Sequence, residues 1–93
     1  MRWTIDNSKI KKKLKDNRGN TEIQRGYTGF VDDIARLGDG DPASIGIRKK
    51  WMGPNFYGYE ATPSIRVIYR IYYKDDLVVV TNIGDHKDVY GRG

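Results

Sequence analysis

Two segments of the sequence carry the side chains best suited to chemistry. The segment IGDHKDVYG (83–91) holds His86, which is the only histidine in the chain. The segment IRVIYRIYY (65–73) holds Arg66 and Arg70. Histidine exchanges a proton near neutral pH, and arginine presents a planar fork of N–H donors that suits oxyanions. We therefore expect an anion-binding surface with a histidine near it.

Composition narrows the classes of protein that this chain can be. The 93 residues are 38% hydrophobic and rich in tyrosine, which predicts one small folded domain spanning 1–93. The chain has no cysteine and one histidine, so disulfides, thiolate chemistry and a metal-ligand cluster are not expected, and no cofactor is predicted. No segment is typical of a signal peptide or a membrane span. The expectation is a cytoplasmic protein with no membrane partner.

The net charge of +5 favours an acidic or polyanionic partner. Residues 1–50 hold 12 Lys and Arg against 7 Asp and Glu, while residues 51–93 hold 5 of each kind. The surplus is concentrated in KIKKKLK (9–15) and RKK (48–50). Four lysines of these runs are candidate phosphate-binding residues: Lys12, Lys13, Lys49 and Lys50. The alternative is an ordinary solvated helix face and loop.

The first half of the chain predicts one strand and two helices. RWTI (2–5) is typical of a strand, and SKIKKKLKDN (8–17) of a short basic helix capped by Asn7 or Ser8. The segment 21–37 predicts a longer helix, with Thr21 as its cap. One face of that helix carries an apolar stripe of Ile23, Tyr27, Phe30, Ile34 and Leu37. Gly26 and Gly29 would let it pack closely against the first helix.

The second half predicts three strands, at 55–61, 65–73 and 77–83, the last two forming a hairpin. The expected fold class is α+β in the order β-α-α-β-β-β, with a two-helix hairpin packed on one face of a small, mostly antiparallel four-stranded sheet. Alternation along 65–73 should turn one set of side chains toward the helices: Ile65, Val67, Tyr69, Ile71 and Tyr73. The other set should lie on the exposed face: Arg66, Ile68, Arg70 and Tyr72.

The segment SIRVIYRIYYKDDLVVVTNIGDHKDVYG (64–91) resembles the C-terminal half of the RelE/ParE toxin superfamily. Those proteins carry a Y-R-V-I-Y-R-I strand, a short acidic turn, an apolar strand and a closing I-G-x-x-x-x-V-Y-R segment. The predicted order of elements is similar over the whole chain. The resemblance implies the toxin of a toxin–antitoxin pair with a cognate antitoxin as partner. RelE-like members cleave mRNA on the ribosome without metal, and ParE-like members inhibit DNA gyrase.

The resemblance also implies roles for individual residues. Arg66 matches the arginine that contacts the scissile phosphate in RelE-like nucleases, and Tyr90 matches the tyrosine near the reacting nucleotide. His86 matches a position where members carry a histidine or arginine, which implies a general acid, and Lys87 is the adjacent basic residue. Arg70 is a second candidate for the phosphate, with a cross-strand surface pair as its alternative.

The sequence also departs from the family pattern. Tyr57 and Tyr59 stand where RelE carries two lysines, and Glu60 is the one carboxylate available as the base on that strand. Gly91 follows Tyr90, so the basic residue of the closing motif is displaced to Arg92.

The resemblance implies RNA cleavage by the 2′-hydroxyl, which needs a base, a phosphate-binding cation and an acid but no metal. We expect Glu60, Arg66 and His86 in these roles, with Tyr90 orienting the phosphate or stacking on a base. Three aromatic residues are candidates for further stacking: Trp51, Phe56 and Tyr57. We expect Trp51 rather to cover an edge of the core. The alternatives are a gyrase inhibitor without catalysis and an inactive relative that mainly binds an antitoxin.

Overall fold

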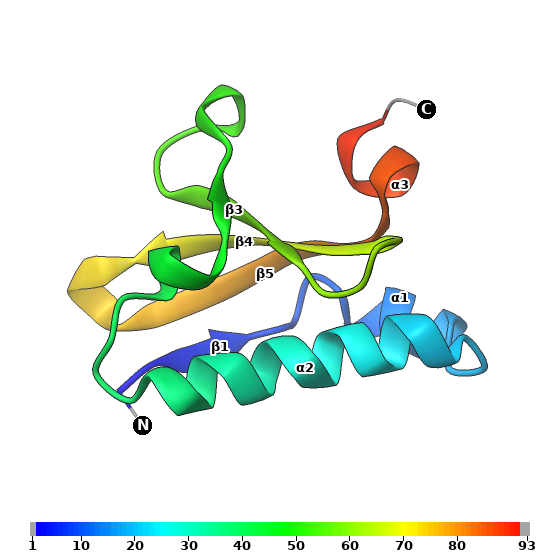
Figure 1. The fold of residues 1–93 in the computed structure, drawn as a ribbon, viewed down its shortest axis with the longest axis horizontal. Helices are drawn as coiled ribbons and strands as arrows, with labels where there is room; N and C mark the ends of the chain where they lie inside the picture. The colour runs from blue at the N-terminus through cyan, green and yellow to red at the C-terminus, as the bar shows by residue number, and fades with distance from the viewer. Residues whose placement is uncertain (1, 92–93) are drawn as a thin grey trace.

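A computed structural model describes residues 2–91 as an α+β domain (Figure 1). Its helices and strands are β1 (Thr4–Asp6), α1 (Lys11–Asp16), α2 (Thr21–Leu37), β2 (Ile47–Arg48), β3 (Phe56–Glu60), β4 (Ile65–Tyr72), β5 (Leu77–Asp85) and α3 (His86–Tyr90). Three single 3₁₀ turns complete it: η1 (Pro42–Ile45), η2 (Lys50–Met52) and η3 (Tyr73–Asp75). The α+β class predicted from the sequence is confirmed.

The strands form one five-stranded sheet in the order β1-β5-β4-β3-β2. β1 is parallel to β5, and the other three neighbouring pairs are antiparallel, so the sheet is mostly antiparallel as predicted. The prediction of four strands is wrong because β2 adds a fifth at the edge of the sheet. β2 has only two residues, Ile47 and Arg48, and so short a run shows no alternation by which a sequence pattern could reveal it.

α2 supplies one side of the hydrophobic core. Asn20 caps the helix, because its side chain accepts a hydrogen bond from the Ile23 N–H, and the predicted cap at Thr21 is wrong by one residue. The apolar stripe is confirmed: Ile23, Phe30 and Ile34 are buried, and Tyr27 and Leu37 pack against the core. Gly38, with φ 58°, follows the last turn of the helix.

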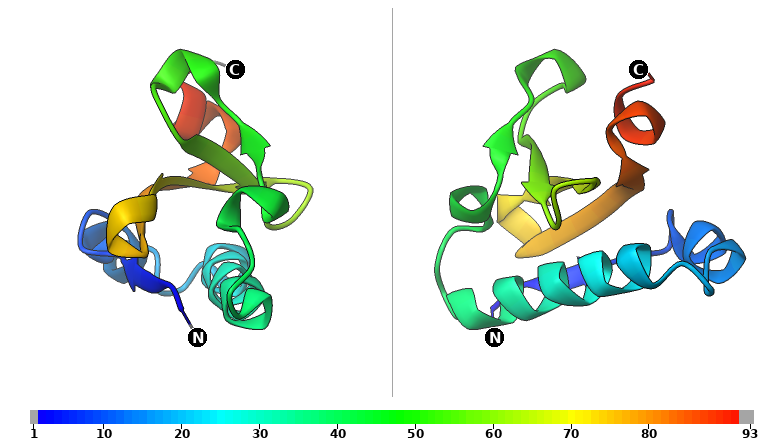
Figure 2. Two further views of the ribbon diagram at one scale, coloured as in Figure 1. Left: turned by 90° about the vertical axis from the view of Figure 1, so that its left-hand side faces the viewer. Right: turned by 45° about the vertical axis from the view of Figure 1, so that its right-hand side comes forward.

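The close approach of α2 is to the sheet and not to α1. A Cβ on Gly26 would lie 3.0 Å from Ile65 Cγ2 and 3.1 Å from Ala61 Cβ, so the glycine lets the helix backbone settle onto the start of β4. α1 is only six residues long and lies beside the N-terminal end of α2 (Figures 1 and 2). Gln24 Nε2 ties the two helices by donating to the Leu14 and Asn17 carbonyls.

The alternation predicted for β4 holds on the side that faces α2 but not on the other side. Ile65, Val67, Tyr69 and Ile71 lie in the core as expected, whereas Tyr73 lies beyond the strand in η3 and is exposed. Ile68, expected on an exposed face, is 0% exposed. The reason is a second layer, since α3 and the η2 segment rise on the face opposite α2 (Figures 1 and 2). β4 is therefore covered from both sides.

Tyr59 joins α2 to β3 and makes the fold sensitive to alkali. Its hydroxyl donates a hydrogen bond to Asp33 Oδ2. Burial, as the larger cause, and this hydrogen bond together raise the pKa of Tyr59 to about 12. A tyrosine in the unfolded chain titrates near pH ~10. The unfolded chain therefore loses this proton first, and the stability linked to Tyr59 is fully present below about pH 10 and lost as the pH rises toward 12.

We predict that Tyr59→Phe makes the free energy of unfolding fall less steeply with pH above pH ~10, because the variant has no hydroxyl to titrate there. Urea unfolding followed by circular dichroism across the alkaline range measures this slope. The exposed Thr28→Ala on the same helix is the control and should keep the wild-type slope. Equal slopes for wild type and Tyr59→Phe would contradict the role given to the Tyr59 proton.

Candidate functional site

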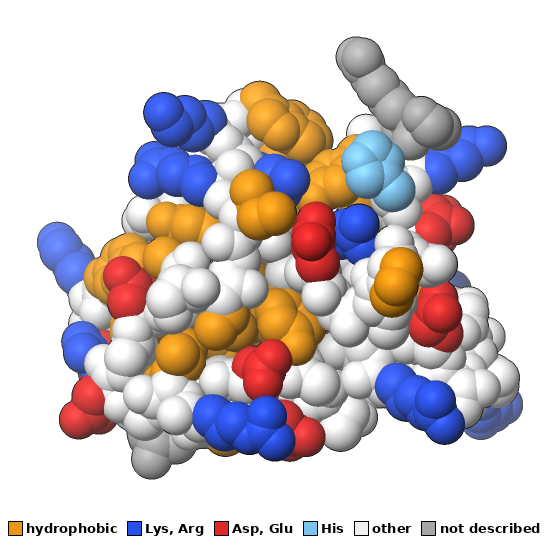
Figure 3. Space-filling view, in the orientation of Figure 1, with side chains coloured by type: hydrophobic (Ala, Val, Ile, Leu, Met, Phe, Trp, Pro, Cys, Tyr) orange, Lys and Arg blue, Asp and Glu red, His pale blue; other side chains and the backbone are white. Residues whose placement is uncertain are grey.

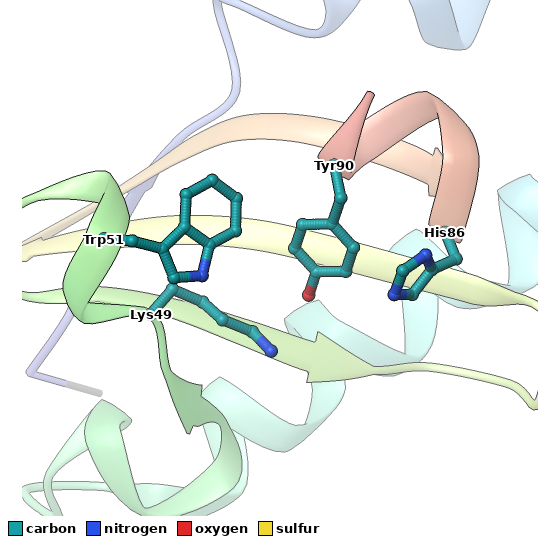
Figure 4. Close-up of a pocket in the computed structure, with 4 residues that line it drawn as sticks. All are labelled: Lys49, Trp51, His86 and Tyr90. Atoms are coloured by element: carbon teal, nitrogen blue, oxygen red, sulfur yellow. The ribbon is translucent and has the colours of Figure 1, made fainter. Parts of the chain in front are cut away.

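A cleft of about 490 Å³ opens between α3 and the η2 segment, and it is lined by Lys49, Trp51, His86 and Tyr90 (Figure 4). These residues come from two parts of the chain that the sheet brings together. His86 and Tyr90 belong to α3, while Lys49 and Trp51 come from the connection between β2 and β3. The cleft therefore gathers a basic, an aromatic and a titratable side chain at one place.

α3 sets the positions of His86 and Tyr90. Asp85 caps the helix by accepting a hydrogen bond from the Asp88 N–H at 2.8 Å, and the buried Val89 anchors it to the sheet. Residues four apart lie on the same side of a helix. The rings of His86 and Tyr90 accordingly lie edge to face, with centroids 4.5 Å apart. The sequence predicted a tail after the last strand, and this short helix was not foreseen.

Tyr90 is the central ring of the cleft. The Trp51 ring lies 5.8 Å from it, centroid to centroid, and Lys49 Nζ lies 5.0 Å from its centroid in a cation–π arrangement. The expectation that Trp51 covers an edge of the core is wrong, because its side chain is 69% exposed. An exposed tryptophan beside a lysine and a histidine gives the cleft a flat apolar wall next to cations. This arrangement suits a planar base attached to a phosphate.

Gly58 of β3 forms the floor of the cleft. A Cβ at this position would lie 2.8 Å from the Tyr90 hydroxyl oxygen and 2.9 Å from Lys49 Cε. Both side chains therefore rest directly on the strand backbone, in space that any other residue would fill. Glycine inside a strand often marks such a close approach, so the sequence did contain a signal for this position.

Arg66 and Glu60 are paired with each other at one end of the same sheet face. They stand opposite one another on β3 and β4, and Arg66 Nε lies 3.7 Å from Glu60 Oε2. Arg66 Nη1 also donates to the carbonyls of Thr62 at 2.8 Å and Pro63 at 3.2 Å. Its side chain is only 18% exposed. The structure thus holds Arg66 against the β3–β4 loop, and neither member of this pair lines the cleft.

Of the other predicted binding residues that the structure describes, only Lys50 and Lys87 lie next to the cleft. Lys50 on η2 and Lys87 on α3 are exposed, and each is next in sequence to a residue that lines the cleft. Lys12 is exposed and paired with Asp16 at 3.4 Å, one turn along α1. Tyr57 is buried against the core and is not available for stacking, and Arg92 lies outside the described residues. Arg70 lies farther along β4, between Phe56 and Tyr72.

Lys13 lies behind the cleft and not on an open surface. It is half-buried, and its Nζ donates to Asn82 Oδ1 at 3.1 Å. A Cβ on Gly84 would lie 2.9 Å from that Nζ and 3.0 Å from Asp88 Oδ2, so Gly84 leaves the space that these two side-chain ends occupy. Lys13 therefore links α1 to β5, and Asn82 in turn donates to the Asp88 carbonyl of α3 at 3.5 Å.

Two absences can be stated for residues 2–91. No group of three or more histidine, aspartate or glutamate side chains lies there in a way that could hold a metal ion. Within the same residues, no helix has the length and apolarity that crossing a membrane requires. Among the described side chains, those available for chemistry in the cleft are a histidine, a lysine and two aromatic rings.

We predict that Gly58→Ala disrupts the cleft while the domain stays folded. The added methyl group must displace the ends of the Tyr90 and Lys49 side chains, both of which are partly exposed. Nuclear Overhauser contacts between the His86 and Tyr90 rings should weaken, while thermal unfolding changes by no more than a few degrees. Gly19→Ala, which has open space around it, is the control and should preserve those ring contacts.

We predict that Lys13→Ala lowers the free energy of unfolding by about 1–2 kcal/mol, because a half-buried charged hydrogen bond is lost. Lys12→Ala removes the same charge from the same helix but only a solvated pair, and should cost less than about 0.5 kcal/mol. Urea unfolding of the two variants makes the comparison. Equal losses would show that the contact of Lys13 with Asn82 contributes nothing to stability.

A comparison of the chain with models of known protein families gives no match, and a search of curated protein sequences also gives none. Function must therefore be inferred from the residues themselves. The cleft lined by Lys49, Trp51, His86 and Tyr90 is the strongest basis for that inference.

Proposed function

We propose that this protein is a RelE-like toxin of a type II toxin–antitoxin pair, which cleaves mRNA on the ribosome without a metal ion. The observation that carries the proposal is the cleft, in which a lysine, a histidine and two exposed or half-exposed aromatic rings converge. The resemblance of residues 64–91 to the RelE/ParE superfamily supports it, and so does the α+β fold with helices against a mostly antiparallel sheet.

The aromatic rings suit single-stranded RNA. An unstacked base of any sequence can stack on an aromatic side chain. Such stacking contributes about 1–3 kcal/mol of binding free energy per base. Trp51 and Tyr90 offer two rings at a centroid distance of 5.8 Å, and Trp51 is largely open to solvent. Lys49, beside the Tyr90 ring, would meet the phosphate attached to such a base.

In the proposed reaction the 2′ oxygen attacks the adjacent phosphorus, and the bond from phosphorus to the 5′ oxygen breaks. The products are a 2′,3′-cyclic phosphate and a 5′-hydroxyl group. His86 donates a proton to the leaving 5′ oxygen, and Lys49 stabilises the negative charge that gathers on the phosphate. Tyr90 lies between these two side chains and would hold the phosphate by its hydroxyl group.

Glu60 is the proposed acceptor of the 2′ proton. It is more than half exposed and lies two residues along β3 from Gly58, on the same face of the sheet. Arg66 Nε lies 3.7 Å from this carboxylate, and Arg66 would approach the phosphate only by leaving the loop carbonyls. The partners that follow from this function are the ribosome, mRNA and a cognate antitoxin.

Induced expression followed by mapping of mRNA 5′ ends tests the proposal. New 5′ ends that accumulate inside translated regions, with 5′-hydroxyl chemistry, are the expected result. Intact mRNA during growth arrest would overturn it. The isolated protein and purified ribosomes carrying a defined mRNA give the same test without the cell.

We predict that His86→Gln slows this cleavage by a factor of about 10²–10⁴, because the general acid is lost, while ribosome binding changes little. Thr28→Gln is the control: it introduces the same side chain at an exposed position of α2, on the other face of the sheet, and should cleave at close to the wild-type rate. Single-turnover rates and binding constants separate the two effects. Equal losses of cleavage and binding in His86→Gln would rule out the role of acid.

A second candidate function is binding without cleavage, as in a ParE-like inhibitor of DNA gyrase or an inactive relative that mainly binds an antitoxin. One observation favours it: Arg66, at the position of the family's phosphate-binding arginine, is engaged by Glu60 and by two loop carbonyls. Growth arrest with intact mRNA and DNA damage signalling would select the gyrase inhibitor. Growth without arrest would select the inactive relative.

A further inference from the structure

Arg70 lies in a second cleft, of about 290 Å³, at the η3 end of β4. Its guanidinium carbon lies 5.2 Å from the centroid of the Phe56 ring and 5.0 Å from that of Tyr72. Arg70 Nε donates to the Pro54 carbonyl at 3.2 Å. Two rings and a backbone carbonyl therefore hold the guanidinium in one orientation, so little side-chain entropy is left to lose on binding.

The remaining N–H groups of Arg70 have no partner among residues 2–91. No carboxylate within that range lies within 4.0 Å of its guanidinium, although Arg2, Arg36 and Arg66 each have one. The two arginines of β4 thus differ in what they can do. Arg66 is paired with Glu60, whereas the guanidinium of Arg70 is preorganised and has no carboxylate partner in the described part of the chain.

Arg70 also lies on the same face of the sheet as the cleft of His86. On β4 it is two residues from Ile68, and on β3 its partner Phe56 is two residues from Gly58, which supports Tyr90. Side chains two residues apart share a face and are separated by about 7 Å along a strand. One extended nucleic-acid strand could therefore contact both clefts.

We propose that Arg70 binds a phosphodiester group of single-stranded RNA next to the nucleotide held in the first cleft. The walls of the second cleft favour a nucleotide over a plain carboxylate, since the Tyr72 ring lies 5.0 Å from the guanidinium and Tyr72 exposes 37% of its surface. Lys74 adds a positive charge and Asp75 a negative one at the rim. In Figure 3, hydrophobic side chains gather on the same side of the molecule as the histidine, with Lys and Arg around them. The inference rests on the proposed function and deepens it.

The test is binding of a short 2′-O-methyl RNA, which cannot be cleaved, over a range of salt concentrations. Arg70→Gln should weaken binding about ten-fold or more and lower the slope of log affinity against log salt by about 0.7, as expected for one phosphate contact on a single strand. Arg70→Lys should keep most of the slope and lose part of the affinity, because the charge remains and the fork is lost. Arg25→Gln removes one charge from the exposed side of α2, across the sheet, and should change neither quantity as much.

The outcomes separate this inference from the proposed function. Equal effects of Arg70→Gln and Arg25→Gln would overturn the Arg70 site even if wild type cleaves mRNA. If RNA binding depends on Arg70 but the wild-type protein does not cleave mRNA, the Arg70 site stands and the proposed nuclease function is overturned. Dependence on Arg70 only for an acidic peptide such as polyglutamate, or no RNA binding by wild type, would overturn the inference. Thermal unfolding of both Arg70 variants checks that each is folded.

Discussion

The burial of β4 on both faces is the constraint on which the rest of the structure depends. Val67 and Tyr69 are completely buried on the side of α2, and Ile68 is completely buried on the other side. A strand covered in this way needs two layers, and a chain of this size has only short segments left for the second one. α3 and the η2 segment supply it. They meet over Ile68 and Gly58, and the cleft is the space that remains between them.

This second layer is too small to be stable alone. A helix of five residues does not persist in water without tertiary support. α3 receives that support from its Asp85 cap, from the buried Val89 and from the contacts of Lys13 and Asn82 behind it. The basic N-terminal helix therefore supports α3 indirectly, through the hydrogen bond of Lys13 to Asn82 of β5. Lys13, which the sequence predicts as part of a phosphate-binding run, instead donates a hydrogen bond to Asn82.

Charge on the sheet face is divided between paired and unpaired groups. Pairing across β3 and β4 places Glu60 beside Arg66 at one end, and Phe56 beside Arg70 at the other. The first arrangement pairs an arginine with a carboxylate, whereas the second orients one that has no carboxylate partner within residues 2–91. Lys49 lies between the two, against the Tyr90 ring. In the proposed function, these cations would attract phosphate and the Glu60 carboxylate would serve as the base.

The sequence by itself determined the elements whose signals are local. The stripe from Ile23 to Leu37 specifies α2 because its period matches the helix, and the hairpin of β4 and β5 follows from two apolar runs and a short acidic turn. The residues of the candidate site were largely predictable as types, since His86, Tyr90 and the basic runs are visible in the sequence. Their arrangement was not. The tertiary structure decided that residues 86–90 form a helix, that Ile47 and Arg48 pair as an edge strand, and that Trp51 is exposed. It also decided that Lys13 contacts Asn82 and Arg66 contacts Glu60, while Arg70 has no carboxylate partner among residues 2–91. Each of these depends on contacts between residues distant in the chain, which no local period or propensity encodes.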